Sequence, residues 1–312
     1  MKKISLIATL FIASLLQAQV KNVKHVILIG VDGLGAYAFP KADAPAMKMM
    51  MENGAWSLHA RSVLPSSSAD NWASMIMGAG PELHGFTEWG SKVPELPSRD
   101  TTQYGLFPTI FYLTKTQRPQ LKTAVIYSWG GIGYLFEKKC VSFEKHIPSD
   151  STTAVEAALY IKQEKPNLLF VHFSDVDGVG HNIGHDIPEY YKQVTTMDGY
   201  VKQILDAIKE AGIMDETVVM LSSDHGGINK GHGGKTLMEV EIPWIVYGNA
   251  VKQKGEVKQS IVTYDTGATI AYLLRLKQPQ LWTGRAVKNI FEKQPDLHFI
   301  RLSFHHSIFT SK

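Results

Sequence analysis

Strand-like and helix-like segments alternate along this chain, and this alternation restricts the fold more than any other feature. Short apolar runs of strand length are separated by helical segments over most of the 312 residues. Strands that alternate with helices are typical of a parallel sheet covered by helices. We therefore expect an α/β fold with a mostly parallel central sheet flanked by helices on both faces. The expected strands are 25–30, 123–127, 168–173, 217–221 and 242–247, and the expected helices are 45–53, 68–77, 107–116, 152–164, 188–210 and 265–274.

Two stretches do not fit this alternation. Residues 79–105 and 129–150 are the least regular, and we expect loops or a small cap near the functional site there. The chain has no internal repeat and no low-complexity linker, so we expect residues 19–312 to form a single domain. Cys140 is the only cysteine, which excludes an internal disulfide, and we expect it to be a buried apolar residue.

The first 18 residues have the pattern of a secretory signal peptide. Lys2 and Lys3 give a positive start, and an apolar run with small residues follows from Ile4 to Leu16. We expect cleavage after Ala18, which would place the protein in the periplasm or outside the cell. The alternative is an N-terminal membrane anchor, but the run is shorter than the roughly 20 residues that span a bilayer. We expect no membrane span in the rest of the chain.

The charge of the chain argues against one class of partner. The formal charge is +3, and loss of Lys2 and Lys3 with the leader leaves 30 basic against 29 acidic residues, or +1. This balance gives no electrostatic basis for nucleic acid binding. Hydrophobic residues make up 44% of the chain, which is enough for a full core. The sequence leaves the oligomeric state open.

Three aspartates stand close behind predicted strands. Asp32, Asp177 and Asp224 each follow one of these strands within a few residues. Binding groups of open α/β sheets gather just beyond the carboxyl ends of the strands. We therefore expect these carboxylates to meet at one edge of the sheet. The alternative, which has most weight for Asp32 taken alone, is an ordinary turn aspartate.

Histidines accompany two of these aspartates. His225 directly follows Asp224 in Ser-Asp-His-Gly, and His232 lies between glycines seven residues later. Taken alone, His232 is typical of a solvated turn. Its closeness to Asp224 and His225 favours a role in the same site. An adjacent carboxylate and imidazole at a strand end suit zinc or manganese.

The third histidine, His181, follows Asp177 by four residues. This spacing would put both side chains on one face of a helix, but Gly178 and Gly180 favour a loop. The neighbours Asp175, His185 and Asp186 are expected to be surface or outer-shell groups. Together the three carboxylates and three imidazoles form a ligand set for two divalent ions, with Zn²⁺ favoured and Mn²⁺ as the alternative.

Three consecutive serines, Ser66, Ser67 and Ser68, precede a predicted helix. One interpretation is an N-cap in a polar turn. The other is a nucleophile, because a metal lowers the pKa of a bound hydroxyl and a helix N-terminus favours the anion. Beside the metal ligands, the second interpretation predicts a metal-dependent hydrolase.

At these residues the chain resembles the alkaline phosphatase superfamily, in particular its type I phosphodiesterase/nucleotide pyrophosphatase branch. The resemblance covers nearly all of the chain after the leader. The family's nucleophile stands ten residues before a Gly-x-x-Pro-x-x-His-Gly motif, which begins here at Gly78, so Ser68 matches it. The other matching segments are Val31-Asp32-Gly33, Asp177-x-x-Gly180-His181-x-x-Gly184, Ser223-Asp224-His225-Gly226, His232, 264–274 and 282–285.

The resemblance implies an alkaline phosphatase-like catalytic domain with two zinc-type ions. It assigns Asp177, His181 and His232 to one ion. It assigns Asp32, Asp224, His225 and the Ser68 oxygen to the other. His84 matches a family motif, but we interpret it as structural.

One position departs from the family. Nucleotide pyrophosphatases usually carry an asparagine twenty-one residues after the nucleophile, where it helps to hold a phosphate oxygen, and this position is Trp89 here. Asn71 or a backbone amide, with Ala69 as the natural candidate, could replace it. We therefore expect Ala69, Asn71 and Trp89 to contact the substrate.

The expected function is a secreted two-metal hydrolase that cleaves a small phosphodiester or pyrophosphate through a phosphoserine at Ser68. A phosphomonoesterase is the alternative within the same class. A sugar-phosphate mutase and an inactive binding protein on the same scaffold are less favoured, because the leader and the complete ligand set argue against them.

Overall fold

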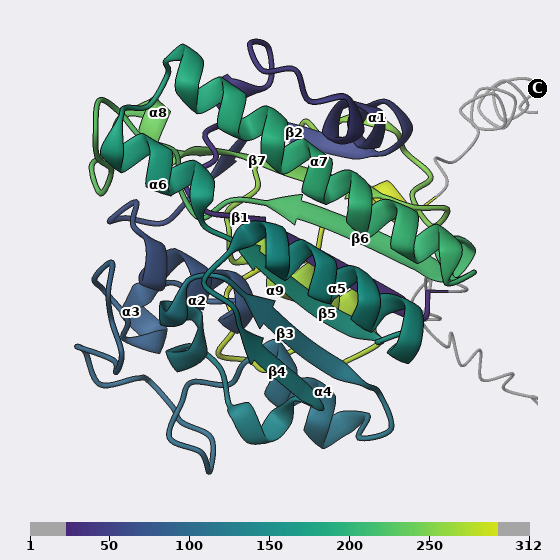
Figure 1. The fold of residues 1–312 in the computed structure, drawn as a ribbon. Coiled ribbons are helices and arrows are strands. Elements are labelled where there is room, and N and C mark those ends of the chain that lie inside the picture. The colour runs from purple at the N-terminus through teal and green to yellow at the C-terminus, as the bar shows by residue number, and fades with distance from the viewer. Residues whose placement is uncertain (1–22, 293–312) are drawn as a thin grey trace, which may run out of the picture.

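The structure is a computed structural model that describes residues 23–292 (Figure 1). The expected signal peptide and the C-terminal tail lie outside this range. Within it, no helix combines the length and the apolar character needed to cross a membrane.

A central sheet organises the described residues. Its eight strands are ordered β4-β3-β5-β1-β6-β7-β2-β8. All neighbouring strands are parallel except the two pairs made by β7, which runs antiparallel to β6 and β2. This confirms the expected mostly parallel sheet. The strands are β1 (His25–Val31), β2 (Ala55–Arg61), β3 (Thr123–Tyr127), β4 (Phe143–His146), β5 (Leu168–Phe173), β6 (Thr217–Ser222), β7 (Glu241–Tyr247) and β8 (Gly255–Glu256).

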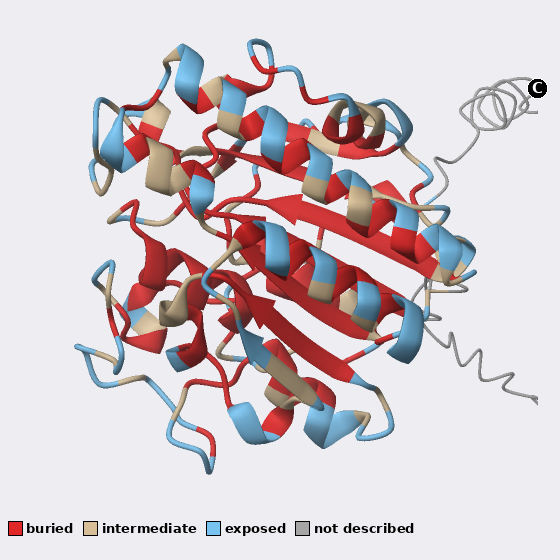
Figure 2. Ribbon diagram, viewed as in Figure 1, coloured by how far each residue is buried: buried red, intermediate tan, exposed pale blue. Residues whose placement is uncertain are grey.

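Helices cover both faces of the sheet, and α5 and α7 cross the near face in Figure 1. Side chains of β1 divide between the faces, since Ile27 and Ile29 join one hydrophobic core and Val26 and Leu28 join the other. The first core includes α1 (Pro45–Asn53), α5 (Asp150–Glu164) and α7 (Pro188–Glu210). The second includes α2 (Ser68–Met77), α4 (Ile110–Gln117) and α9 (Asp265–Leu273). Figure 2 shows the resulting pattern, in which the central strands are buried between helices that expose their outer sides, while the edge strand β4 is partly exposed.

Short helices complete the architecture. They are α3 (Pro81–His84), α6 (Asp175–Asn182), α8 (Leu237–Val240) and the 3₁₀ turns Ala36–Ala38, Gly130–Tyr134, Lys138–Cys140, Met214–Glu216 and Lys288–Phe291. Cys140 is buried, as expected. Several of these short elements lie in the two stretches that the sequence marked as irregular.

Some boundaries differ from the prediction, for local reasons. Helix α4 begins at Ile110 rather than Phe107, because Phe107 precedes a proline, which disfavours helical backbone, and Thr109 caps the helix by accepting the Tyr112 N–H at 3.2 Å. Strand β2 was not predicted. Its sequence lacks the usual apolar alternation, because small residues occupy the buried positions while Trp56 and Leu58 are only partly buried, and its place is fixed by antiparallel pairing with β7.

Candidate active site

The predicted aspartates meet at one edge of the sheet because the strands before them are parallel neighbours. Strand β1 lies between β5 and β6, so their carboxyl ends point the same way. Asp32 follows β1, Asp224 follows β6, and Asp177 lies in the first turn of α6, just after β5.

Asp32 is almost fully buried, at 3% exposed, and one of its oxygens is fixed by two donors. Its Oδ2 accepts hydrogen bonds from Trp72 Nε1 at 3.1 Å and His172 Nε2 at 3.2 Å. Oδ1 has no hydrogen-bond partner and lies 3.5 Å from His225 Nε2. Burial opposes the charge on Asp32, but the hydrogen bonds from His172 and Trp72 outweigh it and hold the pKa of Asp32 well below its usual range.

The sequence analysis did not identify His172. It is a completely buried polar residue in β5, a strand that is otherwise apolar. A single histidine in such a strand usually belongs to the core. The only signal that pointed to the site was its strand, which leads directly towards Asp177.

Asp224 and His225 form the deepest part of the site, and both are fully buried. Asp224 Oδ1 accepts the Gly33 N–H at 3.1 Å, while Oδ2 has no partner and lies 3.2 Å from His225 Nε2. Burial and the charges of Asp32 and Asp177 raise the pKa of Asp224 well above its usual value. Burial and His232 lower the pKa of His225 to about 3, so its ring is neutral, as a metal ligand requires.

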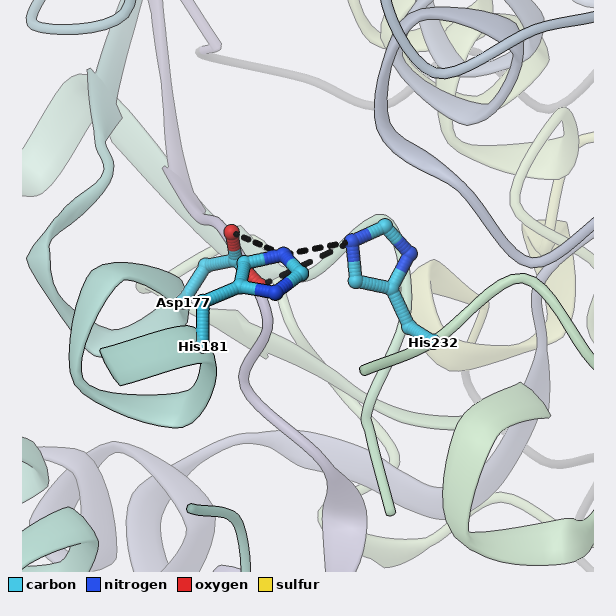
Figure 3. Close-up of side chains that lie close together, drawn as sticks. All are labelled: Asp177, His181 and His232. Atoms are coloured by element: carbon cyan, nitrogen blue, oxygen red, sulfur yellow. Dashed lines mark hydrogen bonds and ion pairs between the residues drawn. The ribbon is translucent and has the colours of Figure 1, made fainter. Parts of the chain in front are cut away.

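Asp177, His181 and His232 form a second cluster (Figure 3), which adjoins the first because Asp177 also lies close to Asp32 and His225. Asp177 Oδ2 lies 3.4 Å from His181 Nε2, and His232 Nε2 lies 3.0 Å from His181 Nε2. His232 donates its Nδ1–H to the Ser66 carbonyl at 3.1 Å, which directs Nε2 into the cluster. Burial and the charge of Asp32 raise the pKa of Asp177 to about 8.

The predicted loop around Asp177 was wrong, because Asp175–Asn182 forms helix α6. The spacing of four therefore does put Asp177 and His181 on one helix face. Gly180 is required by packing rather than by a turn: a Cβ there would lie 2.3 Å from the His185 ring. His185 was expected to be either a surface group or an outer-shell group. Because it is buried, only the outer-shell role fits.

The residues present fit divalent cations. Asp32 Oδ1, Asp177 Oδ1 and Asp224 Oδ2 are buried oxygens without hydrogen-bond partners in the described part of the chain. Three such carboxylates repel one another, and a cation between them would offset both this repulsion and the missing hydrogen bonds.

Two groups of ligand atoms lie close enough to share an ion. One is Asp177, His181 and His232, and the other is Asp32, Asp177 and His225, with the ligand atoms of each group within 4.8 Å of one another. Asp177 thus faces both groups, whereas the sequence assigned it to one. Asp224 lies against His225 in the second group.

The three serines face different neighbours. The Ser66 hydroxyl donates to the Gly234 carbonyl at 2.7 Å, and the Ser67 hydroxyl donates to Asp70. Burial raises the pKa of Asp70 to about 7 even though Ser67 donates to it. Ser66 and Ser67 therefore hold the loop in place.

Ser68 is the serine that faces the acids and histidines. Its Oγ lies 3.2 Å from His225 Nε2. Ser68 is also the first residue of α2, where the helix N-terminus favours negative charge. This position suits a hydroxyl that must ionise.

Two of the three expected substrate contacts, Asn71 and the Ala69 N–H, already have hydrogen-bond partners within the protein. Asn71 is fully buried and turned into the loop: its Oδ1 accepts the Val63 N–H at 2.7 Å, and its Nδ2 donates to the carbonyls of Pro65 at 3.0 Å and Ser67 at 2.9 Å. The structure therefore differs from the prediction that Asn71 holds substrate. The Ala69 N–H donates to the Trp89 carbonyl at 3.1 Å, so a phosphate oxygen would have to displace that carbonyl.

A pocket of about 660 Å³ opens over these groups. Ser68, Asp32, Asp177, His181 and His232 contribute to its lining. The irregular stretches supply further lining residues, namely Thr87, Glu88, Trp89 and Trp129, as the sequence predicted.

The other residues singled out in the sequence lie around this pocket or away from it. His84 is completely buried, with Nε2 2.9 Å from Ser74 Oγ, in agreement with a structural role. Asp175 is exposed, and Asp186 pairs with Lys41 at the surface.

Comparison with known proteins gives one family match over most of the chain and several relatives that align over part of their length. The type I phosphodiesterase/nucleotide pyrophosphatase model matches residues 26–230, and a family described as a protein of unknown function (DUF229) matches 183–301. GPI ethanolamine phosphate transferase 3 of Schizosaccharomyces pombe is 34% identical over 104 residues, or 31% of this chain and 11% of that protein. Human ectonucleotide pyrophosphatase/phosphodiesterase family member 1 is 23% identical over 275 residues, or 82% of this chain and 29% of that protein. The chain spans less than a third of the length of these two curated relatives.

Among solved structures, murine ectonucleotide pyrophosphatase/phosphodiesterase 5, as an inactive variant in complex with AMP, superposes with a TM-score of 0.72. The identity is 13%, and the match covers 86% of this chain and all of that one. This match confirms the expected alkaline phosphatase-like fold.

Proposed function

Since the chain belongs to the type I phosphodiesterase/nucleotide pyrophosphatase family, we propose that it is a metal-dependent phosphodiesterase with Ser68 as its nucleophile. The observation that carries this proposal is the position of Ser68 Oγ, 3.2 Å from His225 Nε2 and beside buried carboxylate oxygens without partners. Among Ser66, Ser67 and Ser68, only Ser68 has a hydroxyl directed at this group.

In this proposal the residues hold two zinc-type ions. Asp177, His181 and His232 would hold one, and Asp32, Asp224, His225 and Ser68 would hold the other, with Asp177 close to both. When bound, such ions lower the pKa of a coordinated oxygen and offset the negative charge of a phosphate.

The reaction takes place in two displacements at phosphorus. The Ser68 hydroxyl gives its proton to water, its oxygen forms a bond to phosphorus while the bond to one alcohol breaks, and that alcohol leaves with a proton from water. Water then attacks the phosphoserine, the Ser68 oxygen–phosphorus bond breaks, and the serine regains its proton. The N-terminus of α2 stabilises the negative charge at Ser68 throughout.

The charge of the pocket favours a diester over a monoester. Among the described residues that line it, none is lysine or arginine. A diester carries one negative charge, whereas a monoester carries up to two near neutral pH, and the second charge has no cationic side chain to meet here. The additional negative charge of a pyrophosphate substrate likewise finds no lysine or arginine among the described lining residues.

A substrate comparison with matched variants tests the proposal. We expect bis(p-nitrophenyl) phosphate to be hydrolysed with a higher kcat/KM than p-nitrophenyl phosphate. Ser68→Ala should abolish turnover, while Ser74→Ala, which removes a buried hydroxyl further along α2, should retain it. Removal of metal with a chelator should stop the reaction, and Zn²⁺ or Mn²⁺ should restore it. A strong monoester preference, an active Ser68→Ala variant or an active metal-free protein would each overturn the corresponding part.

We also propose that residues 1–18 direct export to the periplasm or the outside of the cell. Cell fractionation tests this, and a protein that keeps residues 1–18 and stays in the cytoplasm would contradict it.

A further inference from the structure

A buried carboxylate outside the proposed site contacts the helix that carries two of the proposed ligands. Asp150 is the first residue of α5, is 1% exposed, and belongs neither to the pocket lining nor to either group of possible metal ligands. Its Oδ1 accepts the Ser174 N–H at 3.0 Å, and its Oδ2 accepts the N–H groups of Ser174 at 3.1 Å and Asp175 at 2.8 Å. These donors are the N-cap and the first residue of α6. The Asp150 carboxylate therefore caps a helix other than its own.

Helix α5 does not need this carboxylate as its own cap. Ser149 is the N-cap of α5, and its Oγ accepts the Thr152 N–H at 3.4 Å. An acidic residue in the first turn of a helix is common, because it faces the positive end of the helix dipole. That reason does not account for a buried side chain that directs both of its oxygens at another helix. The contact with α6 is therefore the more specific role of Asp150.

Helix α6 has little stability of its own. It has eight residues, two of which are glycine, and such short helices are marginal without tertiary contacts. Its first internal hydrogen bond runs from the Gly178 N–H to the Ser174 carbonyl at 3.0 Å, so the N–H groups before Gly178 need partners outside the helix. The Ser174 side chain makes no cap hydrogen bond, and its Oγ instead accepts from Ser128 Oγ at 2.9 Å. Asp150 thus supplies the cap that α6 lacks.

The first turn of α6 sets the place of both ligands that this helix carries. Asp177 lies two residues after the capped Asp175, and His181 follows one turn later on the same helix face. Asp177 Oδ1 is buried and has no hydrogen-bond partner in the described part of the chain, so no such bond fixes the direction of this oxygen. Its position depends on the backbone of α6, which Asp150 ties to the start of α5.

We propose that Asp150 is a positioning residue, which holds the first turn of α6 so that Asp177 and His181 stay in place to bind a divalent ion. The inference rests on the proposed function, in which these two residues hold zinc-type ions. Without the cap, the ligands would have to be ordered at the moment of binding, and the cost of that ordering would lower the affinity. Asp150 acts by pre-organisation, and its side chain touches neither metal nor substrate.

The chain offers a matched control in Asp198, a residue of α7. Asp198 is 3% exposed and accepts the N–H groups of Ala46 at 2.9 Å and Met47 at 2.7 Å, in the first turn of α1. Helix α1 also lacks a side-chain cap from its own N-cap residue, and it carries none of the proposed ligands. Asp150→Ala and Asp198→Ala therefore remove the same kind of contact, but only the first affects a helix that carries ligands.

The test measures Zn²⁺ affinity by competition with a chromophoric chelator, in the absence of substrate. We expect Asp150→Ala to lower the affinity by about tenfold, the lower end of losses seen for outer-shell partners, and Asp198→Ala to leave it unchanged. Both variants should lower the melting temperature of the metal-free protein to a similar extent, so general destabilisation does not explain a difference in Zn²⁺ affinity. Asp150→Asn keeps one oxygen acceptor and should lose only about threefold. If Asp150→Ala does not fold, Asp150→Asn and Asp198→Asn give the same comparison.

Hydrogen exchange shows where each variant loosens the chain. Amides of 174–182 should exchange faster in Asp150→Ala, and amides of 45–53 should exchange faster in Asp198→Ala. Saturating Zn²⁺ should slow the exchange of 174–182 in Asp150→Ala, because bound metal stabilises the ordered form of the ligands. Unchanged exchange of 174–182 in Asp150→Ala would contradict a role in holding α6.

The outcomes separate the positioning role from the reaction. If Asp150→Ala binds Zn²⁺ as tightly as the wild-type protein, or if Asp198→Ala loses as much affinity, the positioning role is wrong, whatever the hydrolysis assay shows. If the expected Zn²⁺ affinities are found but the wild-type protein does not hydrolyse bis(p-nitrophenyl) phosphate, the proposed function fails and the positioning role stands. A wild-type protein that binds neither Zn²⁺ nor Mn²⁺ would overturn both.

Discussion

The two halves of the candidate site use similar ligands in different surroundings. In the inner half, the side chains of Asp32, Asp224 and His225 are at most 4% exposed. In the outer half, the His181 side chain is 46% exposed and that of Asp177 is 17% exposed. The inner ligands sit directly on strand ends, whereas the outer ones come from a short helix and a loop.

This difference shows how each half is kept in position. The inner half is fixed by buried donors, such as Trp72 and His172 on Asp32, so its geometry is set by the core of the fold. The outer half depends on the helical spacing in α6 and on the Ser66 carbonyl that orients His232. We therefore expect the inner half to be rigid and costly to alter, and the outer half to be easier to alter without harm to the fold.

The largest effect is expected at the inner half, for Asp224→Asn. Loss of this ligand should lower kcat/KM for bis(p-nitrophenyl) phosphate by more than about a hundredfold, the upper end of losses seen for outer-shell partners. In the metal-free protein the same change should raise the melting temperature near neutral pH, because burial and the neighbouring acids raise the pKa of Asp224, and an asparagine does not have to take up a proton on folding. His181→Asn, at the exposed half, should leave the metal-free melting temperature unchanged. Equal changes in melting temperature for Asp224→Asn and His181→Asn would contradict the expected difference between the buried and the exposed half of the site.

The next effect concerns a residue that acts through Asp32. His172→Phe keeps a ring between its aromatic neighbours but removes the hydrogen bond to Oδ2, and we expect about a 10- to 100-fold loss of metal affinity. Competition with a chromophoric chelator measures this. His84→Phe is the matched control, since His84 is just as buried but lies outside the site. If both variants lost affinity alike, general destabilisation would explain the result.

A smaller effect is expected in the order of metal release. Because His181 is open to solvent while the inner ligands are buried, dilution into chelator should remove the outer ion first. Metal content followed against time should show two phases, and His181→Asn should accelerate only the faster one. A single phase in the wild-type protein would contradict this separation of the halves.

The smallest effect on metal binding is expected for Glu137, a buried carboxylate outside the site. Its Oε1 also lacks a partner, and burial raises its pKa to about 7 from 4.5. The folded state therefore retains a proton that the unfolded state releases, so stability falls as pH rises from about 4.5 to about 7. Glu137→Gln should abolish this slope and stabilise the protein at pH 8 by up to about 3 kcal/mol.

Denaturant titrations at pH 5 and pH 8 check the Glu137 prediction, with metal content as the second readout. Metal content should not change, since Glu137 belongs to neither of the two groups of described residues that could hold an ion. A loss of metal would show that an unpartnered buried oxygen is enough to mark a metal ligand.

The sequence predicted those parts of the molecule that follow from local pattern and topology. Asp32, Asp177 and Asp224 could be placed at one sheet edge because parallel strands end together. Helix α6 was missed because glycines lower helix propensity, and only the packing of His185 against Gly180 explains why a glycine is needed there. The roles of His172 and Asn71 depend on partners far along the chain or on the fold of a loop, so no local pattern carries them.

The position of Asp177 between both ligand groups has a consequence for how the site is loaded. A single carboxylate that serves two ion positions makes the two occupancies interdependent. Whatever factor the first ion applies to the affinity for the second, the second applies to the first by thermodynamic linkage. The loading of the two positions would then be one coupled equilibrium, so a change at either position would alter the metal affinity of the other.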